Sequence, residues 1–167
     1  RVAHGNGMEY NEYKSVRKER KYDMVKELKK DNLWVKIYHT REEMGAAAGK
    51  AAGEKIKNRL AEKREVNVVF AAAPSQNEML RTLAAAEGID WTRVNAFHMD
   101  EYIGLSPDAP QGFGAFLKER MFSLLPFGSV HYLNGNAPDP QAECQRYSAL
   151  LRQFEADLVC MGIGENG

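Results

Sequence analysis

Residues that could bind a ligand or take part in catalysis follow three apolar runs of this 167-residue chain, at the points where each run gives way to a loop. The sequence APS (73–75) follows the first run, Asp100 and Glu101 the second, and GIGENG (162–167) ends the third. Amides at a helix start suit a phosphate, a partly desolvated carboxylate can act as a general base, and glycines let backbone approach a ligand. Because parallel strands gather such ends at one edge of a sheet, the sequence predicts a ligand site there.

Each of these features also has a simpler structural interpretation. Ser75 opens the sequence S-Q-N-E, a capping box with Glu78, and capping is the favoured use of this hydroxyl on spacing alone. An acidic pair in a loop is usually only solvated. His98 and Asp100 share one face of a strand, but two potential ligands without a third predict no metal site. GIGENG lacks the full G-x-G-x-x-G spacing, so it indicates no dinucleotide fingerprint.

Strands and helices that alternate along the chain would position these residues. Apolar, β-branched runs predict five strands, at residues 33–39, 67–73, 92–99, 129–134 and 157–164. Strands that are separated by helices are typical of an α/β fold with a mainly parallel sheet and right-handed crossovers.

Four helices are expected between the strands. The first follows a capping box of Thr40 and Glu43, and the fourth follows Asp139 as a cap with Pro140 in its first turn. The residues expected to face inward are, in the first helix, Met44, Ala48, Ala52, Ile56 and Leu60; in the second, Met79, Leu80, Leu83 and Ala84; in the third, Phe113, Phe116, Leu117, Met121 and Leu124; and in the fourth, Tyr147, Leu150, Leu151 and Phe154.

The composition excludes some classes of protein. Lys and Arg total 23, as do Asp and Glu, so the net charge does not support binding to nucleic acid or anionic lipid mainly through electrostatic attraction. No apolar run approaches the roughly 18 residues that span a bilayer. The first thirty residues lack the apolar core of a secretory signal, so we expect a cytoplasmic protein. Its two cysteines, Cys144 and Cys160, are expected to be reduced and mostly buried.

The N-terminal segment differs from the rest in charge. Residues 1–32 hold nine Lys and Arg against six Asp and Glu, with Tyr13, Val16, Met24 and Leu28 at loosely helical spacing. A basic amphipathic helix can lie on a membrane or dock on a partner, but this thin apolar stripe favours a solvated arm. We therefore divide the chain into a charged arm, 1–32, and an α/β domain, 33–167.

Three motifs give the chain a family resemblance. MDEYIGL (99–105), LNGNAPD (133–139) and MGIGENG (161–167) occur in this order, with Glu143, Cys144 and Tyr147 after the second. From about Leu33 onward the sequence resembles the glucosamine-6-phosphate deaminase (isomerase) family. The related 6-phosphogluconolactonases usually carry Arg where this chain has Tyr102, which favours the deaminase/isomerase branch. The resemblance implies a Rossmann-like, mainly parallel sheet with helices on both faces, whose C-terminal part lies beyond Gly167.

The resemblance also implies a reaction and its residues. A hexosamine 6-phosphate, glucosamine- or galactosamine-6-phosphate, would become a ketose 6-phosphate plus ammonia, without a metal or organic cofactor. Asp100 matches the general base and Asn166 the ring-opening residue. A phosphorylated aminosugar is the expected ligand, and a homo-oligomer is one assembly that the resemblance allows. The substrate-binding residues that the resemblance implies are Ala73, Ser75, Glu101, Gly162 and Gly164.

Two departures from the family pattern leave alternatives open. The phosphate loop of the family usually has paired glycines, whereas this chain has Ala73 and Pro74, and proline offers no amide hydrogen. The family's catalytic His follows the motif that ends here at Gly167, and its phosphate-binding basic residues also lie further on. A 6-phosphogluconolactonase-like hydrolase and a non-catalytic sugar-phosphate-binding regulator are therefore the alternative functions.

Overall fold

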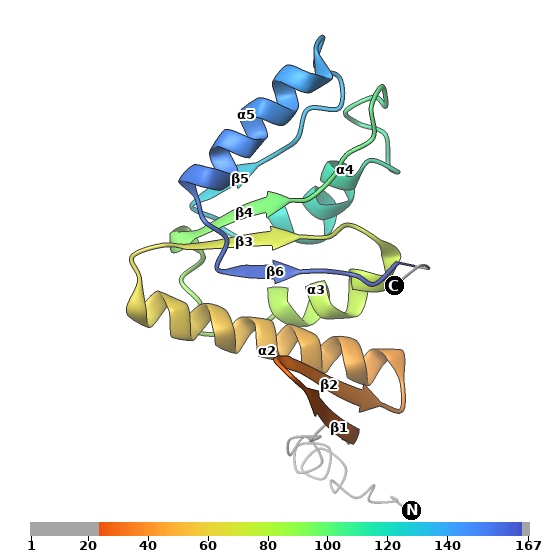
Figure 1. Ribbon diagram of the computed structural model, residues 1–167, viewed down its shortest axis with the longest axis vertical. Helices are drawn as coiled ribbons and strands as arrows, with labels where there is room; N and C mark the ends of the chain where they lie inside the picture. The colour runs from red at the N-terminus through yellow and green to blue at the C-terminus, as the bar shows by residue number, and fades with distance from the viewer. Residues whose placement is uncertain (1–23, 165–167) are drawn as a thin grey trace, which may run out of the picture.

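A parallel sheet forms the centre of the computed structural model, which describes residues 24–164. Its strands are β3 (Val66–Phe70), β4 (Val94–His98), β5 (Ser129–His131) and β6 (Leu158–Cys160), in the order β5-β4-β3-β6 (Figure 1). The chain adds β4 and β5 on one side of β3 and then returns to place β6 on the other side. All pairs in this sheet are parallel, which confirms the predicted α/β architecture.

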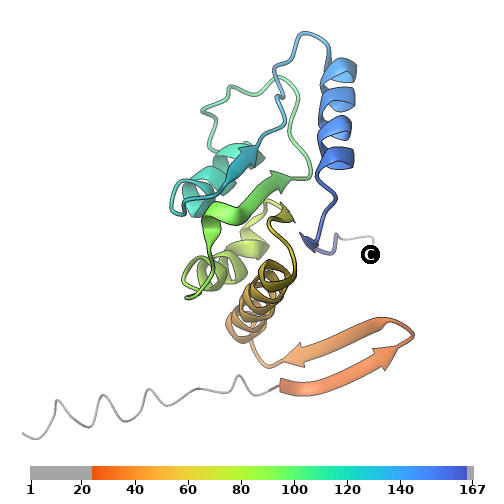
Figure 2. The ribbon, with the colours of Figure 1, turned by 90° about the vertical axis from the view of Figure 1, so that its left-hand side faces the viewer.

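Helices cover both faces of the sheet (Figures 1 and 2). Their bounds are α2, Arg41–Glu62; α3, Asn77–Ala84; α4, Phe113–Leu117; and α5, Pro140–Gln153. Because successive strand side chains point to opposite faces, Val68 and Phe70 pack with α2, α3 and α4, whereas Val69 packs with Phe97 and with Tyr147 of α5. The two faces therefore have separate hydrophobic clusters.

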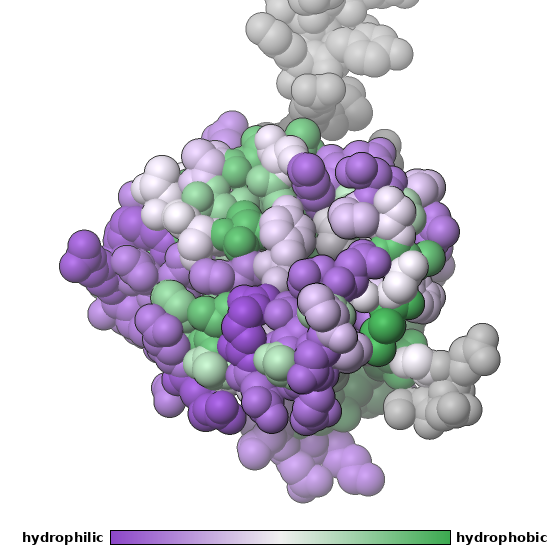
Figure 3. Space-filling model, turned by 90° about the horizontal axis from the view of Figure 1, so that it is seen from above, coloured by the Kyte–Doolittle hydropathy of each residue, from purple (hydrophilic) through white to green (hydrophobic). Residues whose placement is uncertain are grey.

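The surface is mixed in polarity. Figure 3 shows the molecule from above Figure 1, the side of α5, and there hydrophilic residues separate several hydrophobic areas. Across the described part of the chain, no helix combines the length and apolarity that a membrane crossing requires.

Helix α2 begins as predicted but buries a different face. Thr40 and Glu43 form both bonds of the capping box. However, Met44 is 46% exposed and Ala48 is exposed as well, so their predicted inward positions are wrong. Gly45 and Gly49 face α3 instead, and a Cβ at Gly49 would lie 2.6 Å from the Met79 carbonyl oxygen. The helices approach so closely that only glycine fits, a preference that apolar periodicity does not reveal.

The second predicted capping box does not form. Residues Pro74–Gln76 make a 3-10 turn before α3 begins, and the Ser75 side chain accepts no capping bond. Glu78, the other member of the expected box, binds the Arg41 guanidinium of α2 at 3.1 Å. An ion pair between two helices has thus taken the place of the local hydrogen bonds of the expected capping box.

The third predicted helix changes its winding part of the way along. Helix α4 ends at Leu117, and Lys118–Phe122 continue as a π-helical turn. The wider turn changes the phase of the side chains, so Met121 is buried but Leu124 is 64% exposed, contrary to its predicted inward position. In α5, Tyr147 is buried as expected, whereas Leu151 is 37% exposed.

The strand predicted at 33–39 forms, but outside the central sheet. Strand β2 (Leu33–Tyr38) pairs antiparallel with β1 (Met24–Lys30) in a hairpin that projects from the body (Figure 2). The turn between them includes Asp31 with φ 53°, a conformation that Asp tolerates better than most residues. The helical spacing proposed through Met24 and Leu28 is therefore wrong for this part. Tyr13 and Val16 lie outside the described residues.

The two cysteines differ in burial. Cys160 at the end of β6 is buried among the core residues, and burial raises its thiol pKa to about 11. Cys144 on α5 is exposed, so the prediction of two mostly buried thiols is wrong for this residue. Both thiols are free.

Candidate functional site

The carboxyl ends of the parallel strands bring the predicted site segments to one edge of the sheet. Ser75 follows β3, Asp100 follows β4 and Gly162 follows β6. The direction of chain winding reverses between β3 and β6, which is where open α/β sheets bind ligands. The topology therefore supports a site at this edge.

The loops after β3 and β6 lie next to each other. The Ala71 amide donates to the Cys160 carbonyl at 2.9 Å, which extends the pairing beyond the strands. A Cβ on Gly162 would lie 3.3 Å from Nε2 of Gln76, the residue after Ser75. Ser75 is exposed. Apart from the chain neighbours of Gly164, no residue of the described range 24–164 has an atom within 4 Å of the Gly164 Cβ position. These loops leave space for a ligand.

Ala73 is half-buried and precedes the 3-10 turn in extended conformation, with φ −157° and ψ 157°. Asn166 lies outside the described residues, so its place in the site stays a prediction.

The Asp100 side chain is exposed and makes no hydrogen bond or ion pair with the rest of residues 24–164. Partial desolvation raises its pKa, and the charge of Glu101 adds to that rise, which only a positive charge on the His98 ring would oppose. A carboxylate that is both unpaired and more basic than usual is suited to accept a proton.

The adjacent Glu101 has the opposite environment. Its carboxylate accepts hydrogen bonds from the amides of Tyr102, Phe113 and Gly114, at 2.9, 3.0 and 2.8 Å. Desolvation would raise its pKa, but these three amides outweigh it and the pKa is lowered. Glu101 thus fastens the loop after β4 to the start of α4, and its predicted contact with substrate stays a prediction.

His98 lies beneath Asp100 and is fully buried. Its Nε2 accepts from the Leu133 amide at 3.1 Å, so Nδ1 carries the proton and donates to the Asp100 carbonyl at 2.9 Å. Burial lowers the His98 pKa, which keeps the ring neutral. Both nitrogens are engaged within the protein, so His98 is unsuited to ligate a metal; across residues 24–164 no three His, Cys, Asp or Glu side chains group as metal ligands.

Tyr147 contributes to the site, although the sequence placed it only on the inward face of its helix and among the residues of the family resemblance. Its hydroxyl donates to the His98 carbonyl at 2.7 Å and accepts from the His98 amide at 3.1 Å, and burial raises its pKa to about 12. Two signals in the sequence pointed to it: a tyrosine, rather than an aliphatic residue, at an inward position of a helix, and its place after the LNGNAPD motif. Its contact with the end of β4 depends on the packing of α5.

A cavity of about 580 Å³ lies beside these residues. Two of the motifs that carry the family resemblance meet there, since the Gly104 amide donates to the Gly135 carbonyl at 2.9 Å. Glu101 and Tyr132 line the cavity, whereas Asp100 does not. The motif residues 102–105 and 134–136 thus hold two loops together.

Comparison with known families assigns the class of protein. The model of the family described as glucosamine-6-phosphate isomerases/6-phosphogluconolactonase matches residues 39–167. Because the match covers most of the chain, the chain belongs to this family, as the sequence motifs predicted.

The curated relatives within that family carry the deaminase name. A glucosamine-6-phosphate deaminase of an Exiguobacterium species is 40% identical over 112 residues, covering 67% of this chain and 44% of the relative. The enzyme of the same name from Streptococcus sanguinis is 34% identical over 119 residues, covering 71% and 50%. The chain therefore spans about half the length of the curated relatives it matches.

Solved structures agree on the fold. A monomeric glucosamine-6-phosphate deaminase superposes with a TM-score of 0.62 at 27% identity, covering 70% of this chain and 49% of that one. A 6-phosphogluconolactonase from Thermotoga maritima has a TM-score of 0.65 at 25% identity, covering 72% and 56%. Both branches of the family thus share this architecture.

Proposed function

We propose that the protein containing this chain is an aminosugar-phosphate deaminase/isomerase. It would convert glucosamine- or galactosamine-6-phosphate to a ketose 6-phosphate plus ammonia. The observation that carries the proposal is the Asp100 carboxylate, unpaired and of raised pKa at the ligand-binding edge of the sheet. Family membership and relatives named glucosamine-6-phosphate deaminase support it.

Asp100 acts as the general base in this proposal. After the sugar ring opens, its carboxylate takes the proton from carbon 2, and the electron pair of that C–H bond forms the C1–C2 double bond. At the same time the π pair of the carbon 1 carbonyl moves to its oxygen, which gains a proton, so that the product is an enolamine. Return of a proton to carbon 1 leaves an imine at carbon 2, and water hydrolyses it to the ketone and ammonia. A base with a raised pKa holds the transferred proton more readily than an ordinary aspartate.

Substrate binding is assigned to the loops after β3 and β6. Ser75 donates to the phosphate from an exposed turn beside Ala73, and the backbone at Gly162 and Gly164 approaches the sugar. Asn166 assists ring opening. Glu101 orients the loop after β4. Its Oε1 accepts two amide bonds and its Oε2 one, so it would reach substrate only through the remaining lone pair of Oε2.

The test is ammonia release from each hexosamine 6-phosphate by the full-length protein. Asp100→Asn should lower turnover by about 10³-fold and leave substrate binding largely unchanged. Asp108→Asn is the matched control, because it neutralises another exposed carboxylate of the same loop. No ammonia from either epimer, or equal turnover in the Asp100→Asn variant, would refute the proposal.

The main alternative is hydrolysis of 6-phosphogluconolactone, favoured by the structural likeness to the Thermotoga maritima lactonase. Lactone hydrolysis without deamination would establish it in place of the deaminase. Binding of a hexosamine 6-phosphate without any turnover would instead indicate a regulator.

We place the enzyme in the cytoplasm, since a phosphorylated sugar carries charge that hinders its crossing of a bilayer. The balance of 23 basic and 23 acidic residues argues against nucleic acid as a partner. The homo-oligomer expected from the resemblance stays a prediction, which light scattering on the full-length protein would check.

A further inference from the structure

Two polar side chains hold the loop that carries Asp100: Glu101 bonds it to the start of α4, and the buried His98 ring bonds it at Asp100 itself. Asp100 itself makes no side-chain bond among the described residues, so its position depends on its backbone. Within residues 24–164, the carbonyl of that backbone accepts a hydrogen bond from His98 Nδ1 at 2.9 Å. A general base must lie within hydrogen-bond reach of the proton it takes, so this support has a direct chemical consequence.

His98 is itself held on every side. Leu133, in the loop after β5, donates its amide to Nε2, and the Tyr147 hydroxyl bonds both backbone groups of His98. The Tyr132 ring lies edge-on at 5.7 Å, and a Cβ at Gly114 would lie 3.6 Å from Cε1 of the ring. The imidazole therefore cannot turn without breaking bonds to two other elements.

We infer that His98 is a positioning residue for the proposed reaction: its neutral ring joins the loop after β5 to the Asp100 backbone and fixes where the Asp100 carboxylate points. This inference rests on the proposed function for its catalytic consequence. His98 touches no substrate in this role and transfers no proton. Its two nitrogens have separate tasks, because Nδ1 supports Asp100 and Nε2 supports Leu133.

Two substitutions separate these tasks. In His98→Asn the side-chain amide nitrogen takes the place of Nδ1 and can still donate to the Asp100 carbonyl. In His98→Gln the longer side chain brings its amide oxygen to the place of Nε2, where it can accept from Leu133 but leaves the Asp100 carbonyl unsupported. Both variants lose one buried hydrogen bond, so each is the stability control for the other.

The expected result is a kcat that falls by about 10²-fold in His98→Gln, because small misplacements of a reacting group cost this much. His98→Asn should keep kcat close to that of the unsubstituted protein, and KM should change little in either variant. Activities are compared at a temperature at which both variants are folded. If kcat falls equally in both variants, or in neither, the positioning role is overturned.

A second measurement does not depend on turnover. Carboxyl carbon NMR should give Asp100 a raised pKa in the unsubstituted protein and in His98→Asn, and a pKa nearer the ordinary value in His98→Gln. This difference in a protein that releases no ammonia would support the positioning role and refute the proposed function. Ammonia release with the same Asp100 pKa in both variants would support the function and refute the role of His98.

Discussion

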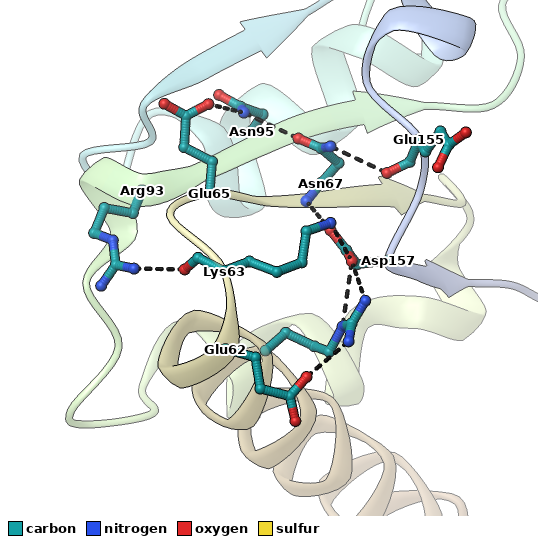
Figure 4. A network of polar contacts seen from close by, with 9 residues as sticks. Glu62, Lys63, Glu65, Asn67, Arg93, Asn95, Glu155 and Asp157 are labelled. Atoms are coloured by element: carbon teal, nitrogen blue, oxygen red, sulfur yellow. Dashed lines mark hydrogen bonds and ion pairs between the residues drawn. The ribbon is translucent and has the colours of Figure 1, made fainter.

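Asp157 and Asp100 lie at opposite edges of the same sheet and have opposite surroundings. At the amino edge, the side chain of Asp157 is 2% exposed and accepts from Arg59 at 2.8 Å, Lys63 at 2.7 Å and the Asn67 amide at 3.0 Å (Figure 4). At the carboxyl edge, Asp100 is exposed and its carboxylate has no protein partner among residues 24–164. The same type of side chain has its oxygens bonded within the protein at one edge of the sheet and is available to bind a ligand at the other.

The amino-edge contacts continue beyond Asp157. The Asn67 side chain donates to the Glu155 carbonyl and accepts from Asn95, each at 3.0 Å, and Asn95 also donates to Glu65 (Figure 4). This network joins α2, β3, β4 and the segment before β6. It teaches that a charged residue at a strand end indicates a site only when its bonding capacity is not already used.

The largest effect on stability is expected from Asp157→Ala. The substitution leaves the Asn67 amide without its acceptor and two cations without their shared partner, so the free energy of unfolding should fall by about 3 kcal/mol. Denaturant unfolding of the full-length protein measures it. Asp108→Ala, at an exposed loop carboxylate, should change that free energy little. Equal stability of both variants would mean that the two edges do not differ in this way.

Two glycines, one at each edge of the sheet, allow the same comparison, with a smaller expected change in stability. Before β5, a Cβ on Gly128 would lie 2.5 Å from the Thr92 carbonyl oxygen, whereas after β6 the Cβ position of Gly164 is open. Gly128→Ala should therefore lower the free energy of unfolding by about 2 kcal/mol, since a tightly packed backbone must shift. Gly164→Ala should leave it unchanged while raising the KM for substrate. Thermal unfolding and steady-state kinetics test the two expectations, and destabilisation by Gly164→Ala would count against an open site.

The smallest expected effects concern the pH dependence of stability, to which the two aspartates should contribute with opposite signs. The three partners hold the pKa of Asp157 below its ordinary value despite burial, so its stabilisation is present above the unfolded pKa of about 3.9 and is lost as pH falls through the folded value. Asp100, with a raised pKa, costs stability above that pKa, and the cost disappears as pH falls through it. At pH 7, Asp157→Asn should thus lower the melting temperature and Asp100→Asn should raise it slightly, with both differences shrinking toward pH 3. Melting curves of both variants and of the unsubstituted protein between pH 3 and pH 7 measure these differences. A lower melting temperature for Asp100→Asn than for the unsubstituted protein at pH 7 would contradict the prediction.

The sequence by itself determined the features that depend on local chemistry. The parallel strands, the capping box at Thr40 and the place of Asp100 just after a strand were predicted from apolar runs, cap residues and motif spacing. These features arise within a few residues of one another, so a linear pattern records them. Family membership was also predicted from motif order, and the family match confirms it.

Only the tertiary structure decided how neighbouring residues of similar type are used. Glu101 is bonded to amides at α4 while Asp100 is left unpaired, and His98 is neutral because Leu133 and Asp100 occupy its two nitrogens. The glycine face of α2 and the position of the hairpin outside the sheet have the same origin. Each depends on partners that are distant in the chain, and their hydrogen bonds and close contacts leave no trace in local periodicity.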